Sequence, residues 1–105
     1  MSMAAAYRTF AHTHPGIYRA TLRAAAPDEP ELVAAAQEIL DILMATLQGY
    51  GLSEEDTLHT ICGLRSVLHG FVDLETSGGF ALALDCDESF RRLIRGFAAA
   101  IRAQV

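Results

Sequence analysis

The sequence has no lysine and no tryptophan, and its 105 residues include only two cysteines and three prolines. All basic residues are arginines, and eight of them stand against thirteen acidic residues, so the formal net charge is −5. Nucleic acids and anionic membranes are bound by clustered positive charge. We therefore expect this chain by itself to bind neither DNA nor a membrane.

Long apolar runs are also missing. No uninterrupted run approaches the roughly 18 residues that a membrane-spanning helix needs. The first six residues carry no positive charge before an apolar stretch, unlike a secretory signal. Cys62 and Cys86 are isolated in the sequence, which favours reduced thiols in the cytoplasm over a single structural disulfide.

Motifs for metal binding and catalysis are absent as well. The sequence has no His-Glu-x-x-His or Cys-x-x-Cys spacing, no Gly-x-Ser-x-Gly and no phosphate-binding glycine loop. His12 and His14 are two residues apart, so on a helix they point in different directions and cannot share a metal ion. We expect no metal, no cofactor and no enzymatic activity.

Apolar residues at helical spacing dominate what is present. Alanine and leucine, both strong helix formers, are the most frequent residues, and no alternating strand pattern occurs. The pattern predicts one all-α domain over residues 1–105, a five-helix bundle. We expect helices at about 2–13, from Pro15 to before Pro27, at 28–49, at 53–78, and from 85 to about 103.

Three of these helices begin with a capping signal. Asp28, Ser53 and Asp85 each put a short polar acceptor before an acidic first turn. Such a side chain accepts hydrogen bonds from free backbone N–H groups, and the acids suit the helix dipole. Glycines at 49–51 and 78–79 predict where the third and fourth helices end.

The last two helices are unusually apolar. On the fourth, apolar residues cover about two-thirds of the circumference, twice what a surface helix needs. A surface this apolar usually becomes an interface, so we expect a homodimer built from the last two helices of each chain. The predicted interface comprises Phe71, Val72, Glu75, Phe80, Phe90, Leu93, Ile94, Phe97 and Ile101.

Polar and small residues on the fourth helix need an explanation. Arg65 and Glu75 fall within its apolar arc, where a charge requires a partner from another helix or subunit, or from a ligand. Gly63 and Gly70 each cost roughly 1 kcal/mol relative to alanine, so another backbone or a ligand should approach closely. His69 is either a hydrogen-bonded structural histidine or a polar contact to that ligand.

A small apolar pocket among the earlier helices would use aromatic and flexible apolar side chains. A hydrophobic core would use the same residues, and the sequence leaves both interpretations open. The candidate effector-binding residues are Phe10, Tyr18, Leu40, Met44, Leu47, Leu68 and His69.

Two parts of the sequence resemble a known family. One comprises residues 7–11 (YRTFA) and 14–19 (HPGIYR), and the other comprises 64–75 (LRSVLHGFVDLE), 78–80 (GGF) and 85–90 (DCDESF). In this order they resemble the C-terminal domain of tetracycline-repressor-like (TetR-family) regulators, in the subgroup with a His-Gly motif in the penultimate helix. The resemblance covers almost the whole chain.

The resemblance implies an all-α domain that dimerises through its last two helices and holds a small, mostly apolar effector among the earlier ones. Effector binding would change the separation of two helix-turn-helix domains and release DNA. Relatives carry that helix-turn-helix before this domain, and this sequence begins at the first effector-domain helix. We therefore expect DNA contact only through a domain outside this sequence. The sequence itself is either a fragment of a longer protein or a stand-alone domain.

Two other functions remain open from the residues. One is a structural helical dimer without a ligand. The other is a small helical enzyme that uses His69 with Arg65 or Glu75. The sequence offers no identifiable third group to orient such a pair, which disfavours the enzyme.

Overall fold

The computed structural model describes residues 2–22, 28–80 and 84–104. Within these residues the chain is helical and forms no strand, which confirms the predicted all-α fold of five helices. The elements are α1 (Ser2–Thr13), α2 (Pro15–Ala20), α3 (Pro30–Leu47), a short 3-10 helix η1 (Gln48–Tyr50), α4 (Glu54–Thr76) and α5 (Cys86–Arg102).

Two of the three predicted helix caps are formed. The Ser53 hydroxyl accepts a hydrogen bond from the backbone N–H of Asp56 at 3.1 Å, and the Asp85 carboxylate accepts from Asp87 at 3.0 Å. The prediction for Asp28 is wrong, because α3 begins at Pro30 with Glu29 at the N-cap position. Proline has no N–H to satisfy and its fixed φ suits the first helical turn, so this helix starts without a side-chain cap.

Helix ends follow the predicted glycines. Gly51 has a φ of 70° directly after η1, and Gly78 has a φ of 77° after α4. Both lie in the left-handed region that glycine enters without steric cost. The second helix is shorter than predicted, since α2 ends at Ala20 and the expected boundary at Pro27 lies outside the described residues.

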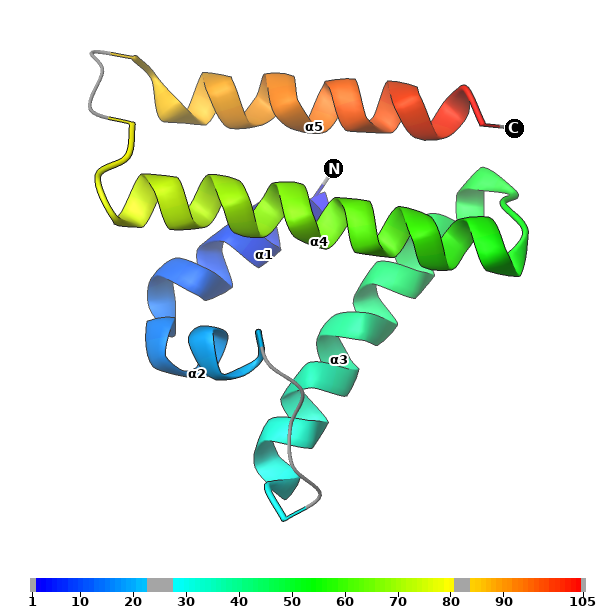
Figure 1. Ribbon diagram of the computed structural model, residues 1–105. Helices are drawn as coiled ribbons and strands as arrows, with labels where there is room; N and C mark the ends of the chain where they lie inside the picture. The colour runs from blue at the N-terminus through cyan, green and yellow to red at the C-terminus, as the bar shows by residue number, and fades with distance from the viewer. Residues whose placement is uncertain (1, 23–27, 81–83, 105) are drawn as a thin grey trace.

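The helices form a thin, two-layered slab. Figure 1 shows α4 and α5 running antiparallel as one layer, with α1, α2 and α3 on the other side of α4. The molecule measures 44 × 36 × 18 Å, and 18 Å is close to two helix diameters of about 10 Å. Its radius of gyration of 14.5 Å exceeds the roughly 13 Å of a compact domain this long. A molecule this thin and extended leaves part of its helix surface without another helix against it.

The hydrophobic core lies where α3, α4 and α5 meet. Its largest fully buried side chains are Leu43, Leu47, Leu64, Leu68 and Ile101. Beside them the Phe71 ring contacts Phe80 and Phe90, each with ring centroids 5.0 Å apart. Gly63 of α4 is also explained here, because a Cβ at this position would lie 3.4 Å from the Phe97 ring of α5.

Much of the predicted dimer interface is covered within the subunit. Most of its members pack against α1 or against each other. One subunit alone therefore buries side chains that the sequence predicted to be buried by a second subunit. Phe71, Val72, Phe90, Ile94 and Ile101 are buried, Leu93, Phe97 and Phe80 are half-buried against the core, and Glu75 is paired with α1. The dimer stays a prediction.

Helix α3 is the least covered element. Val33, Leu40 and Ile42 are 43, 38 and 48% exposed. Pro30–Tyr50 is, by length and composition alone, the one described helical segment able to cross a bilayer, with a mean hydropathy of 1.2. Helices of soluble proteins meet the same criterion. The acidic side chains of Glu38 and Asp41 interrupt the apolar run, which is why counting uninterrupted residues did not find it.

Candidate functional site

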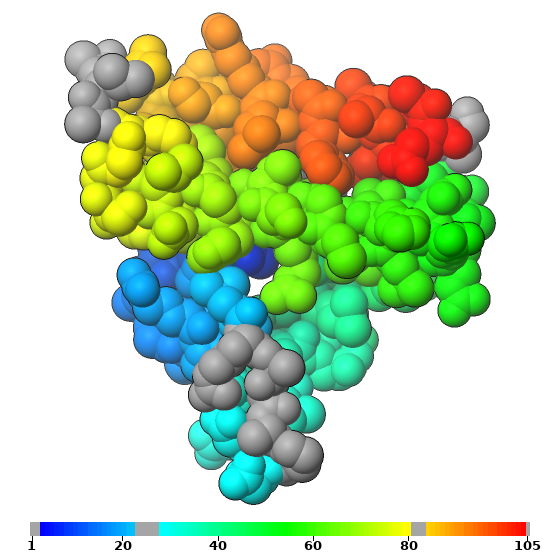
Figure 2. Space-filling view, viewed as in Figure 1, coloured from blue at the N-terminus to red at the C-terminus, as the bar shows by residue number. Residues whose placement is uncertain are grey.

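An apolar cavity of about 410 Å³ lies between α1, α2 and α3. Figure 2 shows α3 projecting from the α4–α5 layer beside α1 and α2. Residues of these three helices line the cavity. Its walls are almost entirely apolar, with one carboxylate and one phenol. The lining residues are Met3, Ala6, Tyr7, Phe10, Ile17, Ala35, Glu38, Ile39, Ile42 and Leu43.

The structure separates the predicted effector-binding residues into four groups. Phe10 lines the cavity, whereas Tyr18 and His69 line a smaller hollow of about 90 Å³ between α2 and α4. Leu47 and Leu68 are fully buried core residues. For these two, the structure supports a role in the core, which was one of the two interpretations that the sequence left open. Met44 packs half-buried against that core, and Leu40 is exposed.

A chain of polar contacts joins the cavity to α4. The Tyr7 hydroxyl lies 3.0 Å from the Tyr18 hydroxyl, which lies 2.7 Å from Nδ1 of His69. Burial raises the pKa of both tyrosines, so both remain neutral hydrogen-bonding groups. His69 is therefore a hydrogen-bonded histidine facing α2, and Tyr7 belongs both to this chain and to the cavity wall.

Arg8 joins α1 to both helices of the other layer. Its guanidinium makes a two-pronged ion pair with Glu75 of α4 and donates to Asp87 of α5 at 2.7 Å. The Arg8 and Glu75 side chains are only 18 and 14% exposed. Nε2 of His12 lies 2.7 Å from the same Glu75 carboxylate. We call Arg8, His12, Glu75 and Asp87 the Arg8 cluster.

Aromatic rings pack against the same guanidinium. Arg8 lies 5.4 Å from the Phe71 ring centroid and 5.0 Å from the Phe90 centroid. Both distances allow cation–π attraction. Glu75 was expected to need a partner because it lies within the apolar arc of α4, and Arg8 of α1 is that partner. Arg65, for which the same was expected, is exposed to solvent.

Hydrogen bonds from the Arg8 guanidinium hold the pKa of the Glu75 carboxyl below its usual range, against the opposing effect of burial. His12 acts in the same direction more weakly. The pair therefore stabilises the fold only while the carboxyl is ionised.

Helix α1 thus presents two neighbouring faces to two different environments. Met3, Tyr7 and Phe10 face the cavity, while Arg8 and Ala11 face α4 and α5. Positions spaced by three and four residues share a face, and the two sets are offset by one residue, about 100° around the helix. The cavity and the α4–α5 pair therefore adjoin neighbouring faces of one helix.

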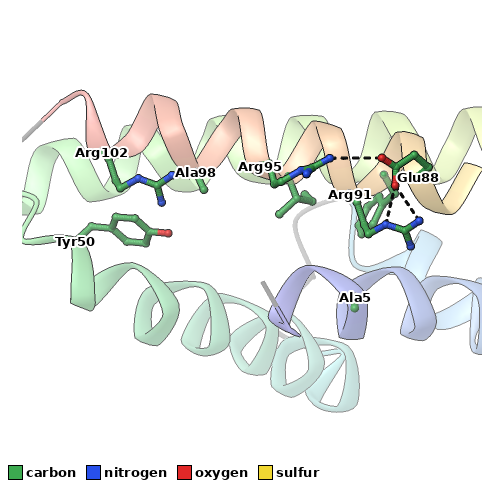
Figure 3. Close-up of a pocket in the computed structure, with 9 residues that line it drawn as sticks. Ala5, Tyr50, Glu88, Arg91, Arg95, Ala98 and Arg102 are labelled. Carbon is green, nitrogen blue, oxygen red and sulfur yellow. Dashed lines mark hydrogen bonds and ion pairs between the residues drawn. The ribbon is translucent and has the colours of Figure 1, made fainter.

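A third hollow, of about 490 Å³, runs along α5. Figure 3 shows Arg91, Arg95 and Arg102 on one side of this helix, with the Tyr50 ring opposite. Glu88 accepts from Arg91 at 2.9 Å, and its pKa is lowered by hydrogen bonds from Arg92 and Arg91. These side chains are largely exposed, and such ion pairs contribute little to stability.

The described residues contain no group of three or more histidines, cysteines or acids that could hold a metal ion. Cys62 and Cys86 are free thiols. Sequence reasoning did not find the cavity's α3 wall or the role of Arg8. The stripe Met3, Ala6, Tyr7 and Phe10 carried a helical signal for one wall, but no local pattern reports that Arg8 meets Glu75, 67 residues away.

Comparison with known proteins gives one family. A family model described as the tetracyclin repressor-like C-terminal domain matches residues 1–97. The chain is 39% identical over 98 residues to the uncharacterized HTH-type transcriptional regulator Rv0681 of Mycobacterium tuberculosis (strain ATCC 25618 / H37Rv). That alignment covers 92% of this chain and 44% of the relative.

A second relative has a similar name. The uncharacterized HTH-type transcriptional regulator YobS of Bacillus subtilis (strain 168) is 36% identical over 97 residues, covering 92% of this chain and 50% of that protein. The chain therefore spans about half the length of the curated relatives it matches.

The Arg8 cluster predicts a large cost for removing its cation. We expect Arg8→Met to lower the free energy of unfolding by about 2–3 kcal/mol, because it leaves Glu75 largely buried without its guanidinium. Urea denaturation followed by circular dichroism measures the change. As a control, Arg92→Met on the exposed side of α5 should stay within about 0.5 kcal/mol of wild type.

The lowered pKa of Glu75 predicts an acid-sensitive fold. The contribution of this carboxylate is fully present above pH 4.5, its ordinary pKa, and is lost as the pH falls through its lowered pKa in the folded chain. Denaturation midpoints measured across acidic pH should therefore fall less steeply in Glu75→Gln than in wild type. Glu54→Gln, at an exposed position, should keep the wild-type steepness, and equal slopes for all three proteins would contradict the prediction.

Proposed function

The chain belongs to the family of tetracyclin repressor-like C-terminal domains, and on that premise we propose that it is the effector-sensing and dimerisation domain of a transcriptional repressor. It is a regulatory domain rather than an enzyme. DNA binding would come from a helix-turn-helix that this sequence does not contain, as the names of its relatives suggest. A regulator of this kind works in the cytoplasm.

The apolar cavity between α1, α2 and α3 carries the proposal. Its volume of about 410 Å³ is typical of small-molecule sites. The lining combines apolar walls with the Tyr7 hydroxyl and the Glu38 carboxylate, which can orient a ligand. The effector we propose is therefore small and mostly apolar, with a single polar end.

The dimer surface we propose is the outward side of α4 and α5. On α4 it comprises Cys62, Ser66, Gly70 and Asp73, and on α5 it comprises Gly96 and Ala100. The residues on α4 lie next to those on α5, because Gly63 of α4 packs against the Phe97 ring of α5. Apart from adjacent residues and the backbone of the same helix, no described atom lies within 4 Å of a Cβ placed at Gly70 or Gly96. Contacts within the subunit therefore do not explain these glycines, which lower helix stability.

Small residues allow two helix backbones to approach closely, which would explain both glycines in a dimer. Four helices, two from each chain, would then bury the uncovered outer face of the slab. The proposed interface is still formed by the last two helices, as the sequence predicted. It uses the side of these helices that carries small residues rather than the apolar side chains.

Effector action follows from the position of α1. A ligand that presses on Met3, Tyr7 or Phe10 moves a helix whose other flank holds Glu75 and Asp87 through Arg8. The α4–α5 pair then has two arrangements, and with it the dimer has two geometries. A ligand shifts the balance only if it binds one arrangement more tightly than the other.

The dimer proposal predicts the effect of one charge on the outer face. Wild-type chain should sediment as a dimer at micromolar concentration in analytical ultracentrifugation, and Gly70→Glu should sediment as a folded monomer, since two buried like charges would face each other. Gly49→Glu, at an exposed position of η1 outside the proposed surface, should remain dimeric. A wild-type monomer at this concentration would refute the dimer.

The cavity proposal predicts that filling it blocks an apolar probe. Nile red, a neutral dye, should bind the chain with increased fluorescence, and Ala35→Trp should abolish that binding because Ala35 lines the cavity. Ala34→Trp is the matched control, since this neighbouring position is exposed and does not line this cavity. Absence of binding to wild type would favour the structural dimer without a ligand.

A further inference from the structure

The hydrogen-bonded chain of Tyr7, Tyr18 and His69 can run in either of two directions. Each phenol has one proton to donate, and a neutral imidazole has one nitrogen that donates and one that accepts. If Nδ1 of His69 accepts from Tyr18 at 2.7 Å, the Tyr18 proton is used, and Tyr7 must donate to Tyr18 at 3.0 Å. If Nδ1 donates instead, the bond between the tyrosines reverses and the Tyr7 proton is left over.

The chemistry of the pair favours Tyr18 as the donor to His69. A phenol O–H is more acidic than the N–H of a neutral imidazole, and an imidazole nitrogen is more basic than a phenol oxygen. The separation of 2.7 Å agrees, because it is shorter than the roughly 2.9–3.0 Å that is usual when an N–H donates to oxygen. Burial raises the pKa of both tyrosines, so both keep the protons that this direction requires.

This direction leaves the Tyr7 oxygen with lone pairs and no free proton. Among the described side chains that line the effector cavity, only Tyr7 and Glu38 carry an oxygen or nitrogen atom. Glu38 is exposed to water, whereas Tyr7 is half-buried. A ligand with an O–H or N–H group can satisfy the Tyr7 oxygen, but a ligand with only a carbonyl or ether oxygen would place two acceptors together and leave both unpaired.

We propose that the effector cavity selects a molecule whose polar end donates a hydrogen bond, such as an alcohol, a phenol or an N–H heterocycle. A molecule of the same shape that can only accept a hydrogen bond would bind less tightly. Tyr7 would accept the bond, and Tyr18 and His69 would be positioning residues that hold the Tyr7 proton away from the ligand. This inference rests on the proposed effector cavity and adds the hydrogen-bonding character of the effector.

Two neutral ligands of nearly identical size and shape test this selection. 2-Phenylindole has an N–H donor where 2-phenylbenzofuran has a ring oxygen and no donor. Their affinities for the wild-type chain can be measured by displacement of Nile red. We expect the indole to bind about fivefold more tightly, as one neutral hydrogen bond would give. A wall without an acceptor would bind the less polar benzofuran at least as tightly.

Substitutions along the chain test both the acceptor and its direction. Tyr7→Phe keeps the ring and removes the lone pairs, so the preference for the indole should disappear while the benzofuran still binds. His69→Leu lets Tyr18 donate to Tyr7 and lets the Tyr7 proton turn towards the ligand. The preference should therefore shrink although His69 does not line the cavity. A merely structural role for His69 would change both affinities together and leave their ratio unaltered.

Two further variants serve as controls. His69→Asn keeps an acceptor oxygen near the position of Nδ1, so it should retain the preference for the indole. Tyr50→Phe removes a phenol that lines the hollow along α5 rather than the effector cavity, and it should also retain the preference. Circular dichroism shows that each variant compared has kept its helices.

The possible failures are distinguishable. If the two ligands bind equally, or the benzofuran binds more tightly, while Nile red still binds, the cavity stands and the hydrogen-bonding inference is overturned. If Tyr7→Phe or His69→Leu keeps the full preference for the indole, the chain does not set it, and the inference is also overturned. If neither ligand and no Nile red binds, the proposed effector cavity fails together with the inference.

Discussion

The ion pair between Arg8 and Glu75 is the contact on which the arrangement of the two layers depends. One guanidinium joins α1 to α4 through Glu75 and to α5 through Asp87, and it also packs against Phe71 and Phe90. Among the residues that the structure describes, His12 with Glu75 and Tyr18 with His69 are the other side-chain hydrogen bonds between segments this distant in sequence. Since both side chains are largely removed from water, the loss of either one leaves the other charge with a weaker set of partners.

This constraint gives α1 its place in the function we propose. A helix held only by apolar contacts could shift against α4 with little penalty, and a ligand behind it would then change nothing further away. Because Arg8 has specific partners on two helices, a movement of α1 would be transmitted to both. The hydrogen-bonded chain from Tyr7 through Tyr18 to His69 adds a second connection to α4. Coupling of this kind needs two defined arrangements, which directional contacts provide better than apolar packing.

The sequence predicted the helices well and the sites poorly, for physical reasons that individual residues show. Ser53, Asp85, Gly51 and Gly78 act within a few residues of themselves, so their effects on helix ends were readable. Asp28 failed because Pro30 sets the start of α3 by its own geometry. Glu75 was correctly identified as a charge that needs a partner, yet its partner lies on a helix far away in sequence. Apolar spacing alone could not tell whether Phe90 faces a twin or, as found, its own subunit.

A double-mutant cycle between Arg8 and Glu75 tests the central claim most directly. The free energies of unfolding of wild type, Arg8→Met, Glu75→Gln and the double variant give the coupling between the two side chains without the separate effects of each substitution. The account predicts a favourable coupling of about 2 kcal/mol, well above that of an exposed ion pair. A coupling near zero would mean that α1 is held by apolar packing alone, and it would contradict the role assigned to this pair.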